Sequence, residues 1–453
     1  MLYDLEQLRR DITDKLIDTV LVVIPDLQGR PVGKRVVGSH FIEHLIDEGI
    51  EACDYLIAVD VDMNPLEGFK FTNWETGYGD MKLKCDTSTP RIIPWLESTA
   101  LIICDCYDSN DQLIQVAPRS ILKAQVEKAR DLGFNIKTGT ELEFFMFNEN
   151  YSTARDKNYR NLNARSKGIE DYQIFQTSLE EKIIRQIRND MLLASIPIEF
   201  SKGEAGNGQH EINITYDTAM TCADNHMIFK NGVREIAALN DKSVTFMAKY
   251  STSEVGSSCH IHSSAWDINT NKSLMSDPQN EGELSEIGKY WIAGQLACAK
   301  DFSILYAPFV NSYKRYVPGS WAPTAIAWGK DNRTCGFRLV GKGRSMRIEN
   351  RIPGADANPY IALSATIAAG LYGVENRIEL SEVLEGNGYV SQNVERIPSN
   401  LSDAIDMFKK SEIAERVFGN SIKDHFLNLA VQELNSFNSS VTDWELNRNF
   451  ERI

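Results

Sequence analysis

Two glutamates in a strand-like segment are the first residues whose type and spacing could support chemistry. Glu141 and Glu143 alternate with apolar residues, and the two-residue repeat of a β-strand places both carboxylates on one face. Neighbouring carboxylates repel each other unless a cation lies between them. The pair therefore indicates a cation site, although a solvent-facing strand edge would show the same pattern.

Two later segments contain residue types that could complete such a site. Glu204 and Glu211 flank a glycine-rich turn, and glycine allows a backbone to approach a ligand closely. His260, His262 and Ser264 share one face of another strand-like segment. A single histidine is more often structural than a ligand, so the histidine pair alone strengthens the interpretation only modestly.

Arginines follow in the last third of the chain. Arg347, Glu349 and Arg351 share one strand face, a pattern that a surface ladder of ion pairs would also produce. Guanidinium groups bind phosphate oxygens in a bidentate manner, and hard divalent cations prefer carboxylate oxygens. Arginines beside carboxylates therefore indicate phosphate held through divalent cations. The arginines of this set are Arg315, Arg333, Arg338, Arg347 and Arg351.

The elements that must position these residues follow from the periodicity of the chain. Leu5, Leu8, Ile12 and Leu16 recur at helical spacing and predict an N-terminal helix. Residues 19–24 and 32–37 predict a hairpin, residues 41–49 a helix and residues 99–106 a strand. Further helices are expected from Pro118 to a stop at Gly133, and from the N-cap Asn358 to about residue 374.

The length and composition limit the class of protein. Because 453 residues exceed the size of one hydrophobic core, we expect a small domain over residues 1–115 and a larger one over 116–453. No apolar run approaches the ~18–20 residues of a membrane helix, and the N-terminus lacks the apolar core of a signal peptide. The scattered cysteines contain no Cys-x-x-Cys pair. A cytoplasmic protein is expected, and the net charge of −15 argues against general nucleic-acid binding.

Six motifs follow one another from about residue 118 to 360. They are Gly139-Thr-Glu-Leu-Glu-Phe, Glu204-Ala-Gly-Asn-Gly-Gln-His-Glu, Gly256-Ser-Ser-Cys-His-Ile-His, Asn311-Ser-Tyr-Lys-Arg, Asp331-Asn-Arg-Thr, and Arg347-Ile-Glu-Asn-Arg-Ile-Pro with Asn358-Pro-Tyr. In types and order these motifs resemble the glutamine synthetase family. The resemblance implies an α+β fold with a small N-terminal β-grasp domain and a large catalytic domain built on an antiparallel sheet with surrounding helices.

The resemblance implies a reaction and a set of roles. ATP phosphorylates a side-chain carboxylate, and an amine then attacks the acyl phosphate; two to three Mg²⁺ or Mn²⁺ ions assist. Glu143, Glu204 and Glu211 match the ligands of the first metal, and Glu141, His260 and Glu349 match those of the second. The nucleotide-contacting positions match Glu199, His262, Ser264 and Arg347; the phosphoryl-holding positions match Arg333 and Arg338; the substrate-binding positions match Arg315, Arg351 and Gly256.

Three departures from the family pattern bear on the substrate. Trp321 stands where ammonia-using members carry a glutamate, and Val255 replaces an asparagine beside the substrate. The acidic loop that completes a neighbour's ammonium pocket has no clear counterpart near Cys53. The pattern resembles the branch that makes γ-glutamyl amides, in which Trp321 would act at the catalytic site by lining a pocket for an amine larger than ammonia.

Several alternatives remain open at this point. An arylamine such as aniline suits Trp321, and an alkylamine, ethanolamine or a polyamine is also compatible with the sequence. An ordinary glutamine synthetase that uses ammonia and an inactive structural or regulatory homologue are the rival interpretations. The resemblance also implies a homododecamer whose sites are completed by neighbouring subunits. Adenylylation is not expected, because Glu395 aligns with the family's regulatory tyrosine.

Overall fold

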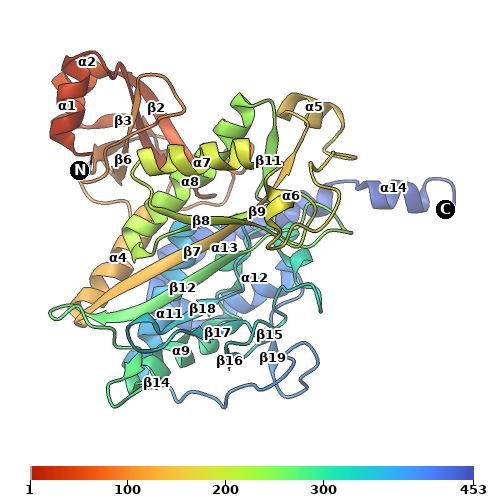
Figure 1. Ribbon diagram of the computed structural model, residues 1–453. Coiled ribbons are helices and arrows are strands. Elements are labelled where there is room, and N and C mark those ends of the chain that lie inside the picture. Colours follow the sequence, from red (N-terminus) through yellow and green to blue (C-terminus); the bar gives the residue numbers. More distant parts are fainter. Residues whose placement is uncertain (1–2) are drawn as a thin grey trace.

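The N-terminal part of the chain forms a six-stranded sheet with the order β2-β1-β6-β4-β3, in which β5 pairs with β6. The computed structural model describes residues 3–453, and Figure 1 shows this sheet beside a larger one. β1 and β6 are parallel, and the other pairs are antiparallel. The strands are β1 Thr19–Pro25, β2 Pro31–Val37, β3 Ile50–Cys53, β4 Asp80–Cys85, β5 Arg91–Ile92 and β6 Thr99–Tyr107.

The predicted elements of this part are confirmed, with one local difference. β1 and β2 form the expected hairpin, and helix α1 (Leu5–Thr13) buries Leu8 and Ile12. Leu16 was expected on the same face but lies beyond the end of the helix, where it is 63% exposed. The predicted helix over residues 41–49 is one helical segment with a π-helical middle, α2 (Gly38–His40), η1 (Phe41–Leu45) and α3 (Ile46–Glu48). It ends at Gly49, whose φ of 74° is easily adopted by glycine.

The larger sheet has nine strands in the order β16-β17-β18-β12-β7-β9-β8, and β10 and β11 also pair with β7. All its pairs are antiparallel except β16 with β17. Its strands are β7 Phe134–Phe147, β8 Ile198–Gly203, β9 Gln209–Ile214, β10 Asp217–Thr218, β11 Ser243–Thr245, β12 Cys259–Asp267, β16 Trp328–Lys330, β17 Phe337–Val340 and β18 Arg347–Asn350. Two short pairs complete the strands, β13 (Ser276–Asp277) with β14 (Asn280–Leu284) and β15 (Ala325–Ile326) with β19 (Glu395–Arg396).

Helices cover one face of the larger sheet and leave the other face accessible. Leu142 and Phe144 on β7 point into the main hydrophobic core, where α4, α8 and α9 pack against the sheet. Alternation along β7 therefore turns Glu141 and Glu143 to the opposite face.

The longer helices are α4 Pro118–Asp131, α7 Glu181–Leu193, α8 Ala219–Leu239, α9 Glu286–Cys298, α11 Pro359–Asn376, α12 Leu401–Lys410 and α13 Glu412–Ser439. The short helices are α5 Tyr151–Asp156, α6 Ile174–Thr177, α10 Ser303–Tyr306 and α14 Asp443–Asn449. The 3₁₀ turns are η2 Asp54–Ile57, η3 Val310–Arg315 and η4 Gly343–Ser345.

The two sheets are joined by buried polar contacts. The Asn358 side chain caps α11 and also donates to the backbone carbonyls of Asp26 and Leu27 in the N-terminal hairpin. The guanidinium of Arg119 on α4 binds Asp105 on β6 and Asp224 on α8. These contacts hold the start of each helix against the N-terminal sheet. The division into domains at residue 115 stays a prediction.

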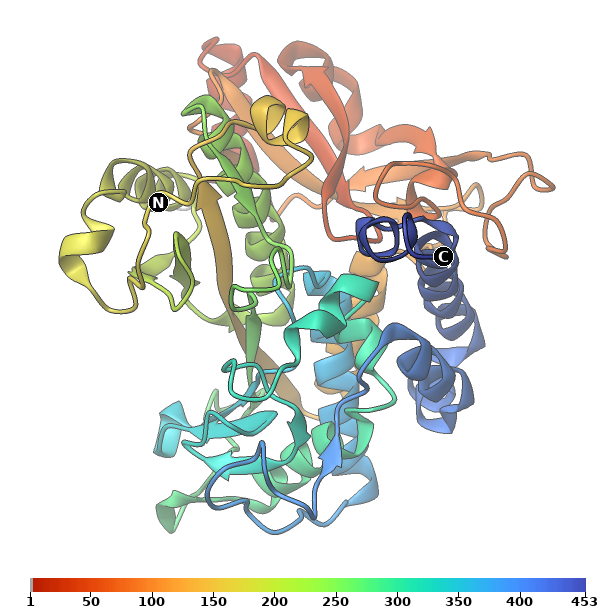
Figure 2. The ribbon, with the colours of Figure 1, turned by 90° about the vertical axis from the view of Figure 1, so that its right-hand side faces the viewer.

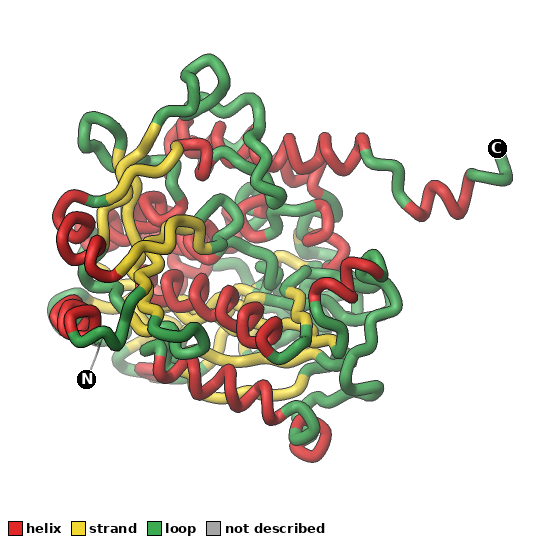
Figure 3. The backbone as a smooth tube through the Cα atoms, turned by 90° about the horizontal axis from the view of Figure 1, so that it is seen from above, coloured by secondary structure: helices red, strands yellow, loops and turns green. Residues whose placement is uncertain are grey.

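The C-terminal helices lie on the outside of this arrangement. α13 passes close to the loops of the N-terminal sheet (Figure 2), where His425 Nε2 is 3.0 Å from the carbonyl oxygen of Ile57. Seen from above, α14 extends away from the rest of the chain (Figure 3).

No helix in residues 3–453 combines the length and the apolar character that a membrane crossing requires. Cys104 and Cys106 are buried on β6.

Candidate active site

Strand pairing brings the predicted functional residues into one row across the accessible face of the larger sheet. Glu143 on β7 lies opposite Glu211 on β9. The register of β12 places His260 opposite Glu141 and His262 opposite Glu349. Since cross-strand neighbours share a face, residues far apart in the sequence become adjacent there.

The first carboxylate cluster is the one expected from the sequence. Glu143, Glu204 and Glu211 each offer an oxygen atom, and these atoms lie within 4.8 Å of one another. Burial and the nearby charge of Glu204 raise the pKa of Glu143 to about 7. Burial and the charges of Glu141 and Glu143 raise the pKa of Glu211 to about 10. Three carboxylates held this closely are the ligand set that a hard divalent cation prefers, and such a cation would relieve their repulsion.

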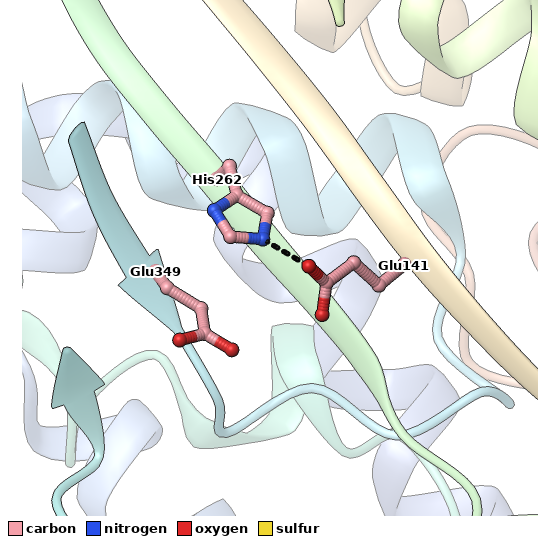
Figure 4. Close-up of side chains that lie close together, drawn as sticks. All are labelled: Glu141, His262 and Glu349. Carbon is pink, nitrogen blue, oxygen red and sulfur yellow. Dashed lines mark hydrogen bonds and ion pairs between the residues drawn. The ribbon is translucent and has the colours of Figure 1, made fainter. Parts of the chain in front are cut away.

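The second cluster differs in one respect from the expectation. Figure 4 shows Glu141, His262 and Glu349 converging from β7, β12 and β18, and their ligand atoms lie within 4.8 Å of one another. His260, which was expected to bind the metal, has its Nδ1 3.0 Å from Glu141 Oε2 and 3.4 Å from Glu349 Oε1. Both histidines therefore reach the same carboxylates, so either imidazole can complete the second cluster.

The electrostatics of the second cluster are opposite to those of the first. Burial alone would raise the pKa of Glu141, but the hydrogen bonds with His260 and His262 outweigh burial and lower that pKa. For Glu349 the burial effect is outweighed by the positive charge of Arg351, and its pKa falls to about 2. These two carboxylates are therefore ionised at neutral pH and suited to a second cation.

Arginines continue the row beyond Glu349. Arg338 lies opposite Glu349 on β17, and its Nη1 donates to Glu349 Oε2 at 3.0 Å. Arg351 Nη1 donates to the other oxygen of Glu349 at 2.6 Å. Glu349 thus holds two guanidinium groups beside the second cluster. Arg333 is exposed and lines the cavity that the two carboxylate clusters also line.

Arg315, predicted to bind substrate, is held by the backbone of the neighbouring strand end. Its side chain is fully buried, and its guanidinium donates to the backbone carbonyls of Arg351 and Ile352. Gly256 packs directly on it, because a Cβ at residue 256 would lie 2.5 Å from Arg315 Cγ. In this conformation Arg315 supports the backbone at the end of β18, although it still borders the cavity.

Two adjoining cavities divide the predicted residues into two groups. The larger, of about 750 Å³, is lined by the six predicted metal ligands together with Gly256, Arg315, Trp321, Arg333, Arg338 and Arg351. The smaller, of about 430 Å³, is lined by Glu199, His262, Ser264 and Arg347. Glu141, Phe200 and Asn213 border both cavities. The proposed nucleotide positions are thus collected beside the proposed metal positions, and all these roles stay predictions.

Two polar residues of the site were missed by the sequence analysis. Gln209 Nε2 donates to Glu143 Oε2 at 3.3 Å and to the carbonyl of Gly256 at 3.0 Å. Lys202 forms ion pairs with Glu204 and with Asp171. Lys202 stands two residues before Glu204 on a strand-like segment, and this spacing could have revealed it. Gln209 stands two residues before Glu211 in the same segment, so strand alternation could have revealed it too.

The larger cavity also has an aromatic and aliphatic wall. Tyr172, Ile174, Phe200 and Trp321 line it. Trp321 is 61% exposed, and its φ of 64° is unusual for a residue other than glycine. Val255 borders the same cavity. The cavity therefore presents charged ligands on one side and apolar side chains on another.

Comparisons with known proteins agree with this geometry. The family model described as glutamine synthetase, catalytic domain, matches residues 115–449. The γ-glutamylethanolamide synthetase GlnA4 of Streptomyces coelicolor is 44% identical over 437 residues, which cover 96% of this chain and 93% of that protein. A glutamate–isopropylamine ligase of a Pseudomonas species is 37% identical over 448 residues, covering 98% and 97% of the two chains.

Similar structures have also been solved. Apo GmaS superposes with a TM-score of 0.86 at 25% sequence identity, covering 99% of this chain and 100% of that one. A GmaS complex with ADP superposes with a TM-score of 0.85 at 26% identity, covering 98% and 99%. The fold with its mixed sheets and surrounding helices is therefore shared with these proteins.

Proposed function

The chain belongs to the glutamine synthetase family, and we propose that it couples the γ-carboxylate of glutamate to an organic amine at the expense of ATP. It is a ligase that forms C–N bonds, as its relatives are. The products would be a γ-glutamyl amide, ADP and phosphate. Both similar ligases named above act on organic amines, ethanolamine in one case and isopropylamine in the other.

One observation carries the choice of an organic amine over ammonia. Trp321 lines the cavity that contains both carboxylate clusters. Its indole offers no negative charge, so it cannot bind ammonium through a charge; its face can offer a cation–π contact. Tyr172 and Ile174 extend the apolar surface of the cavity, which suits the carbon skeleton of an amine.

ATP and divalent metal ions are used throughout the family, and the residues present fit them. Glu143, Glu204 and Glu211 would hold one Mg²⁺ or Mn²⁺, and Glu141, His260 and Glu349 a second. When bound, these ions supply charge that neutralises the phosphate oxygens during transfer. We place the nucleotide in the smaller cavity, which is lined by Glu199, His262, Ser264 and Arg347.

The remaining steps are performed by side chains of this chain. Arg338, held by Glu349, places its positive charge beside the second cluster, where the transferring phosphoryl group would lie. Arg333 borders the same cavity and would add a second charge. Arg351 is bound to Glu349 and to the carbonyl of Trp321. It therefore connects the carboxylate side of the cavity to the residue that we assign to the amine.

The location and the assembly are also proposals. We expect a cytoplasmic enzyme that assembles as a homododecamer, with neighbouring subunits completing each site. Analytical ultracentrifugation of the purified protein tests the assembly. A monomer that is fully active would contradict it.

A panel of amines tests the proposed reaction. Purified protein is incubated with glutamate, ATP, Mg²⁺ and one amine at a time, and mass spectrometry detects γ-glutamyl products. The panel contains ethanolamine, isopropylamine, aniline, a polyamine and ammonia. We expect an amide with at least one organic amine at a higher kcat/KM than glutamine formation.

Two outcomes separate the rival interpretations. Efficient glutamine formation, with ammonia preferred over each organic amine, would identify an ordinary glutamine synthetase. Absence of phosphate release with every amine, in an assembled protein that binds metal, would identify an inactive homologue. An arylamine as the best substrate would match the indole of Trp321 most directly.

A further inference from the structure

A third group of potential ligands lies behind the active site, within the helix-covered side of the larger sheet. It consists of Glu170, Glu180 and His210, each of which offers one ligand atom within 4.8 Å of the others. His210 lies between Gln209 and Glu211 on β9 and is paired with Phe144 of the hydrophobic core. Alternation along the strand therefore turns His210 away from the cavity that Glu211 lines.

The group is sealed from solvent. Glu170, Glu180 and His210 are exposed by 0%, 0–1% and 1% respectively. Charged side chains are almost never fully buried without a compensating partner. Two carboxylates in one buried site are therefore a feature that requires an explanation.

Most oxygen atoms of these two carboxylates accept no hydrogen bond from residues 3–453. Neither oxygen of Glu170 has a hydrogen-bonding partner among the described residues, and the same holds for Oε1 of Glu180. Oε2 of Glu180 contacts His210 Nε2. Arg165 Nε forms an ion pair with Glu180 Oε1 at 3.8 Å, a distance too long for a hydrogen bond. Both oxygens of Glu170 therefore have no partner among the described residues, and Oε1 of Glu180 has only the distant guanidinium.

The backbone explains why these residues meet. Glu170 and Glu180 are the buried ends of a segment, residues 171–179, whose own residues are exposed or only partly buried. Gly203, at the end of β8, allows the Glu170 end of the segment to approach the strand closely. A Cβ at residue 203 would lie 2.6 Å from the carbonyl oxygen of Glu170. Glu180 is the residue that precedes α7. Both ends of the segment are therefore held against β8 and β9.

We propose that Glu170, Glu180 and His210 bind one transition-metal dication, Zn²⁺ or Mn²⁺, at a structural site separate from the two catalytic ones. One imidazole nitrogen with carboxylate oxygens suits these ions better than Mg²⁺, which prefers an all-oxygen shell with several waters. The dication neutralises the two carboxylates and supplies the missing partner of Glu170. It would link Glu170 to Glu180 and so hold the two ends of the segment 171–179 together.

The position of the segment gives the site a consequence for the cavity. Tyr172 and Ile174 belong to the segment and line the larger cavity. Asp171 contacts Lys202, which in turn contacts Glu204. A dication bound to both ends of the segment would therefore fix the positions of Tyr172 and Ile174 in the cavity lining without touching substrate.

Metal analysis of the complete protein tests the site. Wild-type protein is loaded with Zn²⁺ or, separately, Mn²⁺, dialysed against excess Mg²⁺ to exchange ions from the catalytic clusters, which line a cavity and are more accessible than the sealed group, and measured by inductively coupled plasma mass spectrometry. We expect about one equivalent of Zn²⁺ or Mn²⁺ per chain to remain. Wild-type protein that retains neither ion would overturn the proposal.

Matched variants locate the retained ion. H210Q and E180Q are expected to lose it, whereas E149Q is expected to keep it, because Glu149 is a buried carboxylate outside the group whose partners are Lys157 and Asn163. E349Q, which alters a catalytic cluster, is also expected to keep it. Retention by H210Q and E180Q at the wild-type level would overturn the assignment.

Two further measurements do not depend on how well the variants fold. Anomalous diffraction from a crystal of the loaded wild-type protein is expected to show a peak among the three side chains, and a peak elsewhere would contradict the proposal. Removal of the ion from wild-type protein, with Mg²⁺ kept present, is expected to speed tryptic cleavage after the exposed Lys167 and Lys182, which flank the segment. An unchanged cleavage rate would show that the ion does not hold the segment.

Discussion

His260 on β12 lies directly opposite Glu141 on β7, and its Nδ1 is 3.0 Å from Glu141 Oε2. Two residues further along the strand, His262 reaches the other oxygen of Glu141 with its Nε2 at 2.8 Å. One carboxylate is thus shared by two histidines. Burial and the positive charge of Arg351 lower the pKa of His260, so its imidazole is neutral at physiological pH and able to act as a ligand.

Glu349 is expected to be essential, because it belongs to the second cluster and also binds Arg338 and Arg351. E349A should lower kcat by at least about 100-fold through loss of the second cation site. Phosphate release with the preferred amine measures this effect. E283A provides the matched control, since Glu283 is an exposed glutamate that pairs with Lys330 away from the cavity lining, and it should keep wild-type kcat. Wild-type turnover by E349A would show that the second site is assigned wrongly.

Trp321 is expected to decide between organic amines and ammonia. W321E introduces a carboxylate into the larger cavity, where it can bind ammonium, so glutamine formation should rise relative to amide formation. W321Q removes the same indole without adding charge and serves as the control. The ratio of the two kcat/KM values is the measurement. An equal gain in both variants would mean that the loss of bulk, rather than the new charge, admits ammonia.

Arg119 is expected to be a major source of stability between the two sheets. Its guanidinium binds Asp86, Asp105 and Asp224, and the last two are buried. R119M leaves those carboxylates without their cation and should cost about 3–5 kcal/mol of unfolding free energy. Denaturation in urea at one protein concentration measures the loss.

The control for Arg119 is a surface ion pair. Lys70 and Asp424 form an exposed contact at 2.6 Å, and K70M should change the unfolding free energy by less than about 1 kcal/mol. Similar losses for R119M and K70M would mean that the buried network contributes no more than a surface pair.

His425 is expected to make the protein less stable in mild acid. Burial lowers its pKa to about 4, against an ordinary value of 6.5 in the unfolded chain. The unfolded state therefore binds the proton first, and stability falls as pH drops below 6.5 until the loss is complete below about 4. The full effect is about 3 kcal/mol. Unfolding midpoints measured across this pH range test it.

H425Q isolates the contribution of that histidine. Glutamine keeps a donor for the carbonyl oxygen of Ile57, which His425 contacts in the wild type, but it does not titrate. The acid-induced loss of stability should therefore be smaller in H425Q than in the wild type. Parallel pH profiles for the two proteins would assign the acid sensitivity to other groups.

The sequence predicted those features that depend on local periodicity and on motif order. The hairpin of β1 and β2, the helix that starts at Pro118 and the cap at Asn358 all follow from neighbouring residues, and the structure confirms them. Alternation on β7 was sufficient to predict that Glu141 and Glu143 share a face, because side-chain direction in a strand depends only on residue number. The order of motifs was sufficient to identify the family.

Tertiary structure decided the features that depend on strand register and on chain packing. The pairing of β12 with both β7 and β18 places the two histidines on the same carboxylates, which no local pattern specifies. Packing directed the Arg315 guanidinium to two backbone carbonyls. It also brought Glu170, Glu180 and His210 together from a loop, a helix start and a strand. Such contacts arise because folding brings distant segments into one interior, where a charge must find a partner that the linear sequence does not show.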